Sequence, residues 1–137
     1  MPETLRLEIV TPEGTVFSED VLMVTLLAVE GQLGIYPVHI PLITQVIPGE
    51  IIAHQAGHEK FLAVGEGLVD IEARRVTIIT DMAVAADNID EAKAEEARQR
   101  AAARLREKIS DEEVASVNAS MVRSLAQLQV KRRHRKV

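Results

Sequence analysis

The first part of the chain alternates between hydrophobic and polar positions. Leu5, Leu7 and Ile9 share one face of an extended segment, and Arg6 and Glu8 share the other. Further apolar runs rich in β-branched residues follow, many with glycine or proline between them, at residues 16–17, 21–28, 42–47, 50–54, 60–64, 68–71 and 76–80. Short strands at this spacing predict an all-β sandwich or barrel.

Turn residues punctuate this part of the chain. Residues 11–14 read Thr-Pro-Glu-Gly, and residues 56–58 read Ala-Gly-His, which predicts the tip of a hairpin. Residues 65–67 read Gly-Glu-Gly. This pair of glycines predicts a bend or bulge at which side chains would be in the way.

The pattern changes to a helical period near residue 87. Asn88 is expected to cap a helix that begins at Ile89, and Ser110 with Glu113 forms a capping box for a second helix. Thin apolar stripes run along both helices: Ala97, Ala101, Leu105 and Ile109 on the first, and Val114, Val117, Met121, Leu125 and Leu128 on the second. Two such helices are expected to pack as an antiparallel hairpin.

This hairpin has little apolar area with which to hold itself in place. Alanines dominate the first helix, and a large side chain contributes about 1.5–3 kcal/mol only when it is fully buried. Ordering about 40 residues costs a comparable amount of free energy. The sequence therefore predicts a weakly held element that can leave the β module, which is how a conformational switch behaves.

Charge and composition divide the chain at the same point. Residues 1–86 hold 4 Lys and Arg against 12 Asp and Glu, a net charge of −8, whereas residues 87–137 hold 12 against 9, a net charge of +3; together they give the −5 of the whole chain. All 7 glycines and all 5 prolines lie in the first part. We therefore predict a turn-rich β module at residues 1–86 and a helical module at residues 87–137.

Several classes of protein are excluded by residues that the sequence lacks. Without cysteine there are no disulfides, thiolate metal sites or cysteine nucleophiles. No apolar run reaches the roughly 20 residues of a membrane span, and no basic start precedes an apolar stretch, so a cytoplasmic protein is expected. The four histidines lack zinc-ligand spacing, and no nucleophile-elbow or phosphate-loop motif is present. The chain is predicted not to be an enzyme.

The end of the chain is strongly basic, with Lys131, Arg132, Arg133, Arg135 and Lys136. One interpretation is a solvated end that keeps the protein soluble, and another is a segment that docks on an acidic protein surface. Nucleic acid fits less well as a partner, because the rest of the chain is acidic and aromatic residues make up only 2 %.

Four motifs, taken in order, resemble one family. They are residues 10–14 (Val-Thr-Pro-Glu-Gly), 30–39 (Glu-Gly-Gln-Leu-Gly-Ile-Tyr-Pro-Val-His), 65–67 (Gly-Glu-Gly) and 89–94 (Ile-Asp-Glu-Ala-Lys-Ala). Over essentially the whole chain, this set is similar to the ε subunits of bacterial F-type ATP synthases. The resemblance implies an α+β fold, in which a ten-stranded antiparallel β-sandwich is followed by an antiparallel two-helix hairpin.

The resemblance also implies a non-catalytic central-stalk subunit of the rotor that requires no cofactor. Its β module is expected to pack on the γ subunit and to contact the c-ring, which couples ring rotation to the catalytic head. The expected c-ring contacts are Glu30, Gly31, Gln32, Tyr36 and His39. The alternative is that Tyr36 and His39 only satisfy each other or the backbone. The family usually has a glutamate where Gln32 stands and a glycine where Val38 stands.

The helical module is expected to inhibit ATP hydrolysis. In the family a folded-down hairpin is permissive, whereas an extended hairpin inserts between subunits of the catalytic head and obstructs rotation. Docking on the α and β subunits of the head is expected to involve Arg123, Lys131, Arg132, Arg133, Arg135 and Lys136.

Some family members bind ATP on the folded hairpin, and part of their motif is present. The matching residues are Ile89, Asp90, Lys93, Ala94, Arg100 and Arg123. Lys93 replaces a family arginine that would bind in a bidentate manner, and Val84 and Gln127 replace an acid and a second arginine. The resemblance thus implies a weak regulatory ATP site, and the alternative is an ordinary helix cap with solvated charges.

The expected location is the cytoplasmic face of the bacterial cell membrane, reached only through the complex. A nucleotide-sensing β-sandwich adaptor outside the ATP synthase is the alternative function, and a nucleic-acid-binding module is a less favoured third. Co-purification with a large membrane-attached complex would support the first function, and salt-sensitive binding to nucleic acid would support the last.

Overall fold

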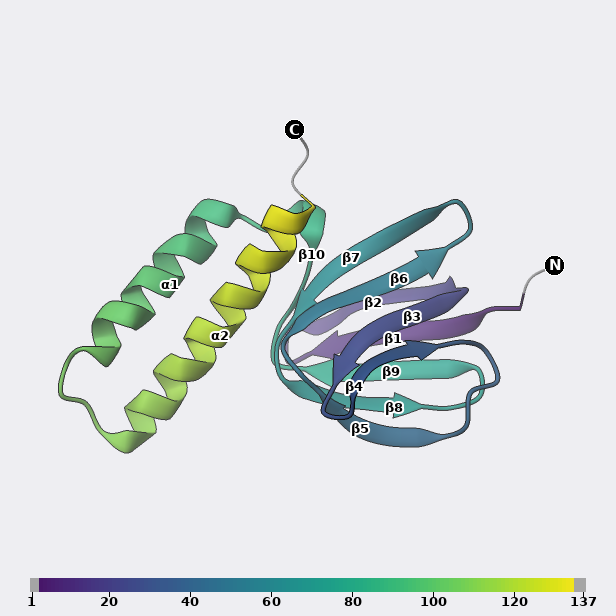
Figure 1. The fold of residues 1–137 in the computed structure, drawn as a ribbon, viewed down its shortest axis with the longest axis horizontal. Helices are drawn as coiled ribbons and strands as arrows, with labels where there is room; N and C mark the ends of the chain where they lie inside the picture. Colours follow the sequence, from purple (N-terminus) through teal and green to yellow (C-terminus); the bar gives the residue numbers. More distant parts are fainter. Residues whose placement is uncertain (1–2, 135–137) are drawn as a thin grey trace.

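A computed structural model describes residues 3–134 of the chain, and within them ten strands precede two helices (Figure 1). The strands are β1 (Leu5–Thr11), β2 (Gly14–Val21), β3 (Met23–Ala28), β4 (Gly31–Ile35), β5 (Leu42–Val46), β6 (Gly49–Gln55), β7 (His58–Val64), β8 (Gly67–Ile71), β9 (Arg75–Thr80) and β10 (Ala83–Ala85). A single 3₁₀ turn, η1 (Ala86–Asn88), leads to α1 (Glu91–Leu105) and α2 (Asp111–Arg133).

The strands form one sheet that folds over on itself into a sandwich. Their order is β10-β7-β6-β3-β5-β8-β9-β1-β2, and β4 adds to β3 outside this path. Figure 1 shows β6 and β7 in one layer and β5, β8 and β9 in the other. The predicted ten-stranded sandwich is confirmed. Its pairings among the described residues are antiparallel except for β1 with β9, which run parallel.

The space between the layers is filled almost entirely by aliphatic side chains. Along β1 the burial alternates as the sequence pattern predicts, with Leu5, Leu7 and Ile9 buried. The other buried members of this core are Phe17, Val21, Val24, Leu26, Ala28, Ile35, Val46, Ile51, Ala53, Leu62, Val64, Val69, Ile71, Val76 and Ile78. Most are β-branched or leucine residues, which suit a pleated and well-packed interior.

The apolar run at residues 21–28 is not the single strand that its pattern predicts. Val21 ends β2 and pairs with Leu5 of β1, whereas Met23 begins β3 and pairs with His54 of β6. The chain passes from one layer to the other at Leu22 and stays apolar throughout, so the sequence carries no sign of the break. This part of the prediction was wrong.

The bend predicted at residues 65–67 is confirmed. A Cβ atom at Gly67 would lie 2.0 Å from the carbonyl oxygen of Ile79, and one at Gly65 would lie 1.9 Å from Oδ1 of Asp81. Both approaches are far inside van der Waals contact, so only glycine fits without a shift of its neighbours.

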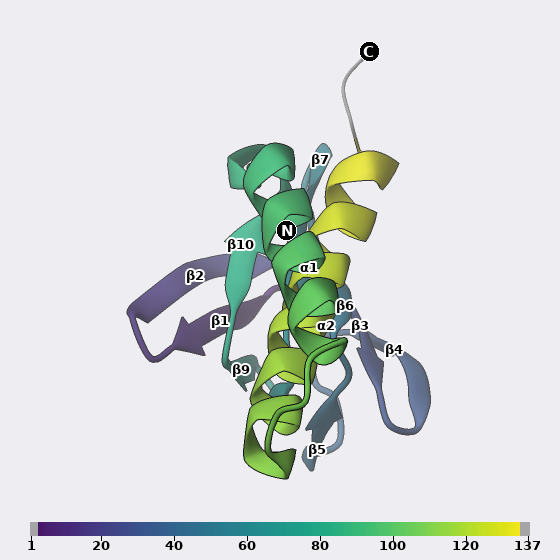
Figure 2. The ribbon, with the colours of Figure 1, turned by 90° about the vertical axis from the view of Figure 1, so that its left-hand side faces the viewer.

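The helices form the expected hairpin, and α2 lies between α1 and the sandwich (Figures 1 and 2). Figure 2 looks at the molecule from the hairpin side and shows the β1–β2 and β3–β4 hairpins extending to opposite sides behind the helices. No helix in residues 3–134 is long and apolar enough to cross a membrane.

The first helix begins later than its sequence predicts. Asn88 lies in the 3₁₀ turn η1, and Asp90 caps α1 by accepting the N–H of Lys93 at 3.1 Å. Ile89 keeps an extended backbone, which carries its side chain into the contact between hairpin and sandwich, where it is 5 % exposed. Burial of this one apolar side chain therefore displaces the cap by two residues.

The second helix has the expected cap but a wider buried surface than expected. Ser110 accepts the N–H of Glu113 at 3.2 Å, as the capping box predicts. Leu125 was expected on the buried stripe, but it is 38 % exposed. The reason is that α2 buries a second face, which carries Ala126 and Val130, and Leu125 lies outside both buried faces.

Candidate functional site

The loop between β4 and β5 exposes some of the expected c-ring residues. The side chain of Tyr36 extends into solvent, and this residue is 61 % exposed. Nδ1 of His39 lies 2.5 Å from the carbonyl oxygen of Ile40, so its N–H donates to the backbone. His39 is thus partly satisfied within the loop, as the alternative interpretation expected, whereas no partner for Tyr36 is found among residues 3–134.

Val38 adopts a backbone conformation that favours glycine. Its φ is 66°, in the left-handed region that β-branched residues rarely adopt. Its N–H donates to the carbonyl oxygen of Ala73, 2.5 Å away in the turn between β8 and β9, and this bond pins the loop in that conformation. A β-branched residue in this conformation therefore leaves strain in the loop.

Glu30 is held back against the sheet. Both of its carboxylate oxygens lie within reach of the Thr44 hydroxyl, which donates at 2.6 and 2.8 Å. Gly31 follows with a φ of 119°, which favours glycine, and Gln32 is exposed. Of these three expected contact residues, Gln32 is the one whose side chain is most available to a partner.

A line of apolar side chains lies uncovered on the layer that contains β5, β8 and β9. We call Val29, Ile47, Leu68 and Ile79 the apolar strip; they are between 36 % and 56 % exposed. Leu68 and Ile79 face each other on paired strands, and Val29, Ile47 and Leu68 line one shallow hollow. An uncovered apolar surface of this kind is typical of an interface.

The end of α2 is attached to the sandwich at Glu50 of β6. Arg133 donates to one oxygen of this carboxylate at 2.9 Å, and Nε2 of His134 lies 2.5 Å from the other. The imidazole ring of His134 also stacks on Phe61 of β7, with ring centroids 3.6 Å apart and planes 18° apart. The Glu50 side chain is only 11 % exposed, so this is the least solvated ion pair of the hairpin contact.

Beneath these ion pairs lies a small apolar cluster. Val130 of α2 covers Ala63 of β7, Ala86 of η1 and Ile89, and Phe61 and Val84 flank the cluster. Leu62 and Val64 face the sandwich core, so Ala63 between them faces outward to the helix. Two of the four buried residues of this cluster are alanines, so it offers much less apolar area than the sandwich core.

Arg132 joins α2 to α1. Its guanidinium donates to Glu91 at 2.9 Å and to Glu95 at 3.4 Å. A hydrogen bond from Arg98 lowers the pKa of Glu95, and the charge of Arg132 lowers it further. Glu95 is thus kept ionised by two arginines, one on each helix.

Two further basic residues tie α2 to the body of the protein. Arg123 pairs with Asp81 at 3.2 Å, and the ammonium of Lys131 donates to the carbonyl oxygen of Ala86 at 3.3 Å. The Asp81 carboxylate occupies the space that the missing side chain of Gly65 leaves open. Arg135 and Lys136 lie outside the described residues.

Three of the first four residues of the expected ATP motif serve the fold. Ile89 and Ala94 are buried, Asp90 caps α1, and Lys93 is exposed on the first turn of that helix.

The two arginines expected at the phosphates point to different places. Arg100 lines a groove between α1 and α2, whereas Arg123 lines a cavity between α2 and the sandwich and pairs with Asp81. No described pocket contains both arginines, and ATP binding stays a prediction.

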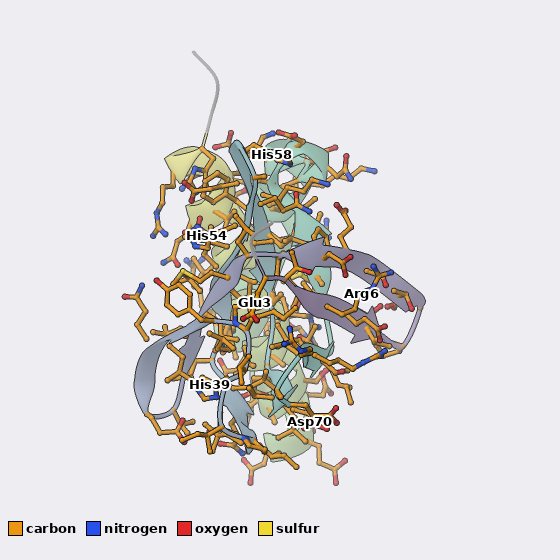
Figure 3. The ribbon with its side chains drawn as sticks, turned by 90° about the vertical axis from the view of Figure 1, so that its right-hand side faces the viewer. Glu3, Arg6, His39, His54, His58 and Asp70 are labelled. Carbon is orange, nitrogen blue, oxygen red and sulfur yellow. The ribbon has the colours of Figure 1, made fainter. Side chains whose placement is uncertain are left out.

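The histidines do not gather into a site. Figure 3 shows His54 and His58 toward one end of the sandwich and His39 toward the opposite end, near the loop between β4 and β5. His134 lies on the hairpin side. Within residues 3–134, no three His, Asp or Glu side chains are placed to hold a metal ion.

Family models match both halves of the chain. Residues 4–86 match the model described as ATP synthase, Delta/Epsilon chain, beta-sandwich domain, and residues 87–132 match ATP synthase, Delta/Epsilon chain, long alpha-helix domain. The chain belongs to the ATP synthase delta/epsilon chain family. The two matches meet between residues 86 and 87, where β10 gives way to η1.

Solved structures of ATP synthases contain chains with the same fold as this delta/epsilon chain. One is in the Euglena gracilis mitochondrial ATP synthase, solved by cryo-EM as OSCP/F1/c-ring in rotational state 1; it is 20 % identical with a TM-score of 0.71, over 98 % of this chain and 84 % of that one. Another is in the central stalk/c-ring of the Tetrahymena thermophila mitochondrial ATP synthase, 14 % identical with a TM-score of 0.62, over 94 % of this chain and 97 % of that one.

The residues that hold the delta/epsilon hairpin in place were missed by sequence reasoning. Glu50, Phe61, Asp81 and His134 lie on separate elements, and no local motif joins them. The one available signal was the opposite net charge of the two modules, which favours contact between an acidic sandwich and a basic helix end.

Proposed function

We propose that this chain is a non-catalytic rotor subunit of an F-type ATP synthase, which couples c-ring rotation to the catalytic head through γ and inhibits ATP hydrolysis with its helical hairpin. Membership of the family and the fold of chains in two ATP synthase assemblies support this proposal. The subunit acts at the cytoplasmic face of a bacterial membrane and reaches that membrane only through the complex.

The coupling role needs two separate contact surfaces on the sandwich. The apolar strip of Val29, Ile47, Leu68 and Ile79 suits a lasting contact with γ, because its side chains gain from removal from water. The loop between β4 and β5 suits the c-ring, since it exposes Tyr36 and has a backbone fixed by proline and by the bond to Ala73.

The observation that carries the inhibitory role is the pairing of the basic residues on α2. Arg123, Lys131, Arg132 and Arg133 are all satisfied within the folded-back chain. Arg123, Lys131 and Arg133 lose their partners when the hairpin leaves the sandwich, and Arg132 loses its partners when α2 separates from α1. Folding back therefore keeps these docking residues paired, and an extended hairpin makes them available to acidic segments of the catalytic head.

The test is ATP hydrolysis by the assembled complex, carrying either the full chain or a chain that ends at Ala86. A higher rate with the shortened chain is expected if the hairpin is a brake. An unchanged rate, with equal incorporation of both chains in the purified complex, contradicts the inhibitory role and leaves the coupling role. Failure of both chains to join the complex contradicts the whole proposal.

A weak regulatory ATP site on the folded hairpin is the second part of the proposal. Its support is the groove between α1 and α2, which is lined by Arg100 and Arg104 together with the hydroxyls of Ser116 and Ser120. Calorimetric titration of the isolated chain with ATP tests it, with Arg100→Ala as the variant and Arg106→Ala as the matched control. Equal heats from the two variants and the unaltered chain contradict binding in this groove.

A further inference from the structure

One of the side chains that attach α2 to the sandwich is a histidine, His134. Arginine and lysine stay protonated and carboxylates stay ionised over the physiological range, whereas histidine gains or loses its proton between about pH 5 and 8. His134 is the last described residue of the chain and makes the 2.5 Å contact with Glu50. Its charge therefore bears directly on the contact between hairpin and sandwich.

Several charged side chains surround the ring of His134. Glu50 of β6 faces it directly, and the hollow around it also contains Glu19 of β2, Glu59 and Lys60 of β7, and Asp87 of η1. From α2 itself, Arg133 and Lys131 stand nearby, but both have other acceptors, Glu50 for the first and Ala86 for the second.

The charged side chains around the ring of His134 carry a net negative charge. Lys60 is engaged by Glu19, whose pKa is lowered by a hydrogen bond from Gln55 and by Lys60 itself. This pair is internally neutral. The carboxylates that remain are Glu50, Asp87 and Glu59, of which Glu59 lies 3.5 Å from Nδ1 of His54, and they outnumber the positive charges of Arg133 and Lys131.

Phe61 keeps the ring in place in either charge state. The stacked geometry, with centroids 3.6 Å apart, holds the imidazole over the aromatic face, and a protonated ring gains additional attraction from the π electrons. The same geometry fixes the Nε2 atom toward Glu50. A proton on His134 is thus met by a carboxylate at the ring edge and an aromatic face beneath it.

We propose that His134, Glu50 and Phe61 form a clamp that holds the hairpin on the sandwich more tightly when the imidazole is protonated. We call the chain with its hairpin packed on the sandwich the closed form, and the chain with its hairpin released the open form. In the open form His134 faces water and has no such partner, so the closed form binds more protons than the open form. Falling pH therefore shifts the equilibrium toward the closed form, and rising pH toward release. The clamp rests on the proposed function only in its consequence, that acidification favours the permissive position of the hairpin.

A single cysteine beneath the helix measures this equilibrium in the intact chain, which has no cysteine of its own. Ala63→Cys places a thiol under Val130, at a position that is 0 % exposed in the closed form. The rate at which a thiol reagent modifies it reports the fraction of open chains, even when that fraction is small. Because thiol reactivity itself rises with pH, each rate is divided by the rate of the same cysteine in the His134→Gln background.

Protection of the thiol is the rate in the His134→Gln background divided by the rate in the chain that keeps His134. We expect this protection to be about fivefold greater at about pH 6 than at about pH 8. The reason is that a charge-assisted hydrogen bond is roughly twice as strong as a neutral one. Glu50→Gln and His134→Phe, which retains the stacking, should each remove the pH dependence. His58→Gln, which removes an exposed histidine at the start of β7, should leave it unchanged.

Three results overturn the clamp. They are a protection ratio that is the same at both pH values, a pH dependence that survives Glu50→Gln, and a pH dependence that disappears in His58→Gln. The measurement is made on the isolated chain, so it does not depend on hydrolysis by the complex. If truncation of the hairpin leaves the rate of ATP hydrolysis unchanged, the inhibitory role is contradicted but the clamp is not. If the protection of the thiol does not depend on pH, the clamp is contradicted but the inhibitory role is not.

Discussion

The sandwich and the hairpin of this delta/epsilon chain are held together by different forces. Large aliphatic side chains fill most of the sandwich core, whereas the hairpin meets the sandwich through a small cluster built on Ala63, Ala86, Ile89 and Val130 and through a set of ion pairs. Apolar burial is strong and insensitive to small changes in solution, but each partly exposed ion pair contributes only up to about 1 kcal/mol and is screened by salt. A movable element on a rigid body is the physical consequence.

The largest expected effect is a loss of stability in the sandwich, the rigid part of the molecule. Gly67→Ala places a Cβ against the backbone of Ile79, which cannot move without disrupting the pairing of β8 with β9. We expect the free energy of unfolding to fall by about 3 kcal/mol. Urea unfolding followed by circular dichroism measures it, and a midpoint equal to that of the unaltered chain would show that this contact is not tight.

The second largest expected effect is a gain in stability from the strained loop between β4 and β5. Val38→Gly relieves the left-handed conformation at φ 66°, so we expect the free energy of unfolding to rise by about 0.5–1 kcal/mol. The control is Ile43→Gly, at a similarly exposed and regularly paired position of β5, which should lower stability instead. A loss of stability in both variants would contradict the account of this loop.

Gly65→Ala makes the same change two residues away from Gly67, but we expect it to affect the hairpin contact rather than the sandwich. Here the new Cβ meets the end of the Asp81 side chain, which can turn aside and release Arg123. We expect about threefold weaker protection of the α2 amides from hydrogen exchange, with little change in the urea midpoint. A midpoint lowered as far as in Gly67→Ala would place Gly65 in the rigid half of the molecule.

The smallest expected effect is the acid dependence of the hairpin. The hydrogen bond from Arg98, with the charge of Arg132, lowers the pKa of Glu95 below its ordinary value of 4.5. A carboxyl whose pKa is lowered by folding stabilises the folded form above its unfolded pKa, and this contribution is lost as the pH falls through the lowered value.

Protection of the α1 and α2 amides should therefore decrease below about pH 4.5, once exchange rates are corrected for the intrinsic effect of pH. In Glu95→Gln this decrease should be smaller. An identical decrease in both chains would assign the acid sensitivity to other carboxylates.

Sequence patterns predicted the parts of this fold that depend on local repetition. The alternation of Leu5, Leu7 and Ile9 and the Ser110 cap both follow from neighbours a few residues apart, and both are found in the structure. The two close-packed glycines of residues 65–67 also marked their bend correctly.

The parts that were missed depend on contacts between distant segments. The break at Leu22 separates two strands that pair with different partners, and the cap moved from Asn88 to Asp90 because Ile89 is buried against the sandwich. The attachment of His134 to Glu50 joins residues 84 positions apart. No periodicity within either segment encodes such a contact, although the opposite charges of the two modules favour it.

Hydrogen exchange of the intact chain in low and high salt tests the central claim most directly. At about 1 M salt, compared with about 50 mM, ion pairs are screened while apolar burial is retained. We predict that the amides of α1 and α2 exchange several-fold faster in high salt, whereas those of β1 and β9 are unchanged. Helices and strands that exchange at one common rate under both conditions would contradict the separation of this chain into a rigid sandwich and a releasable hairpin.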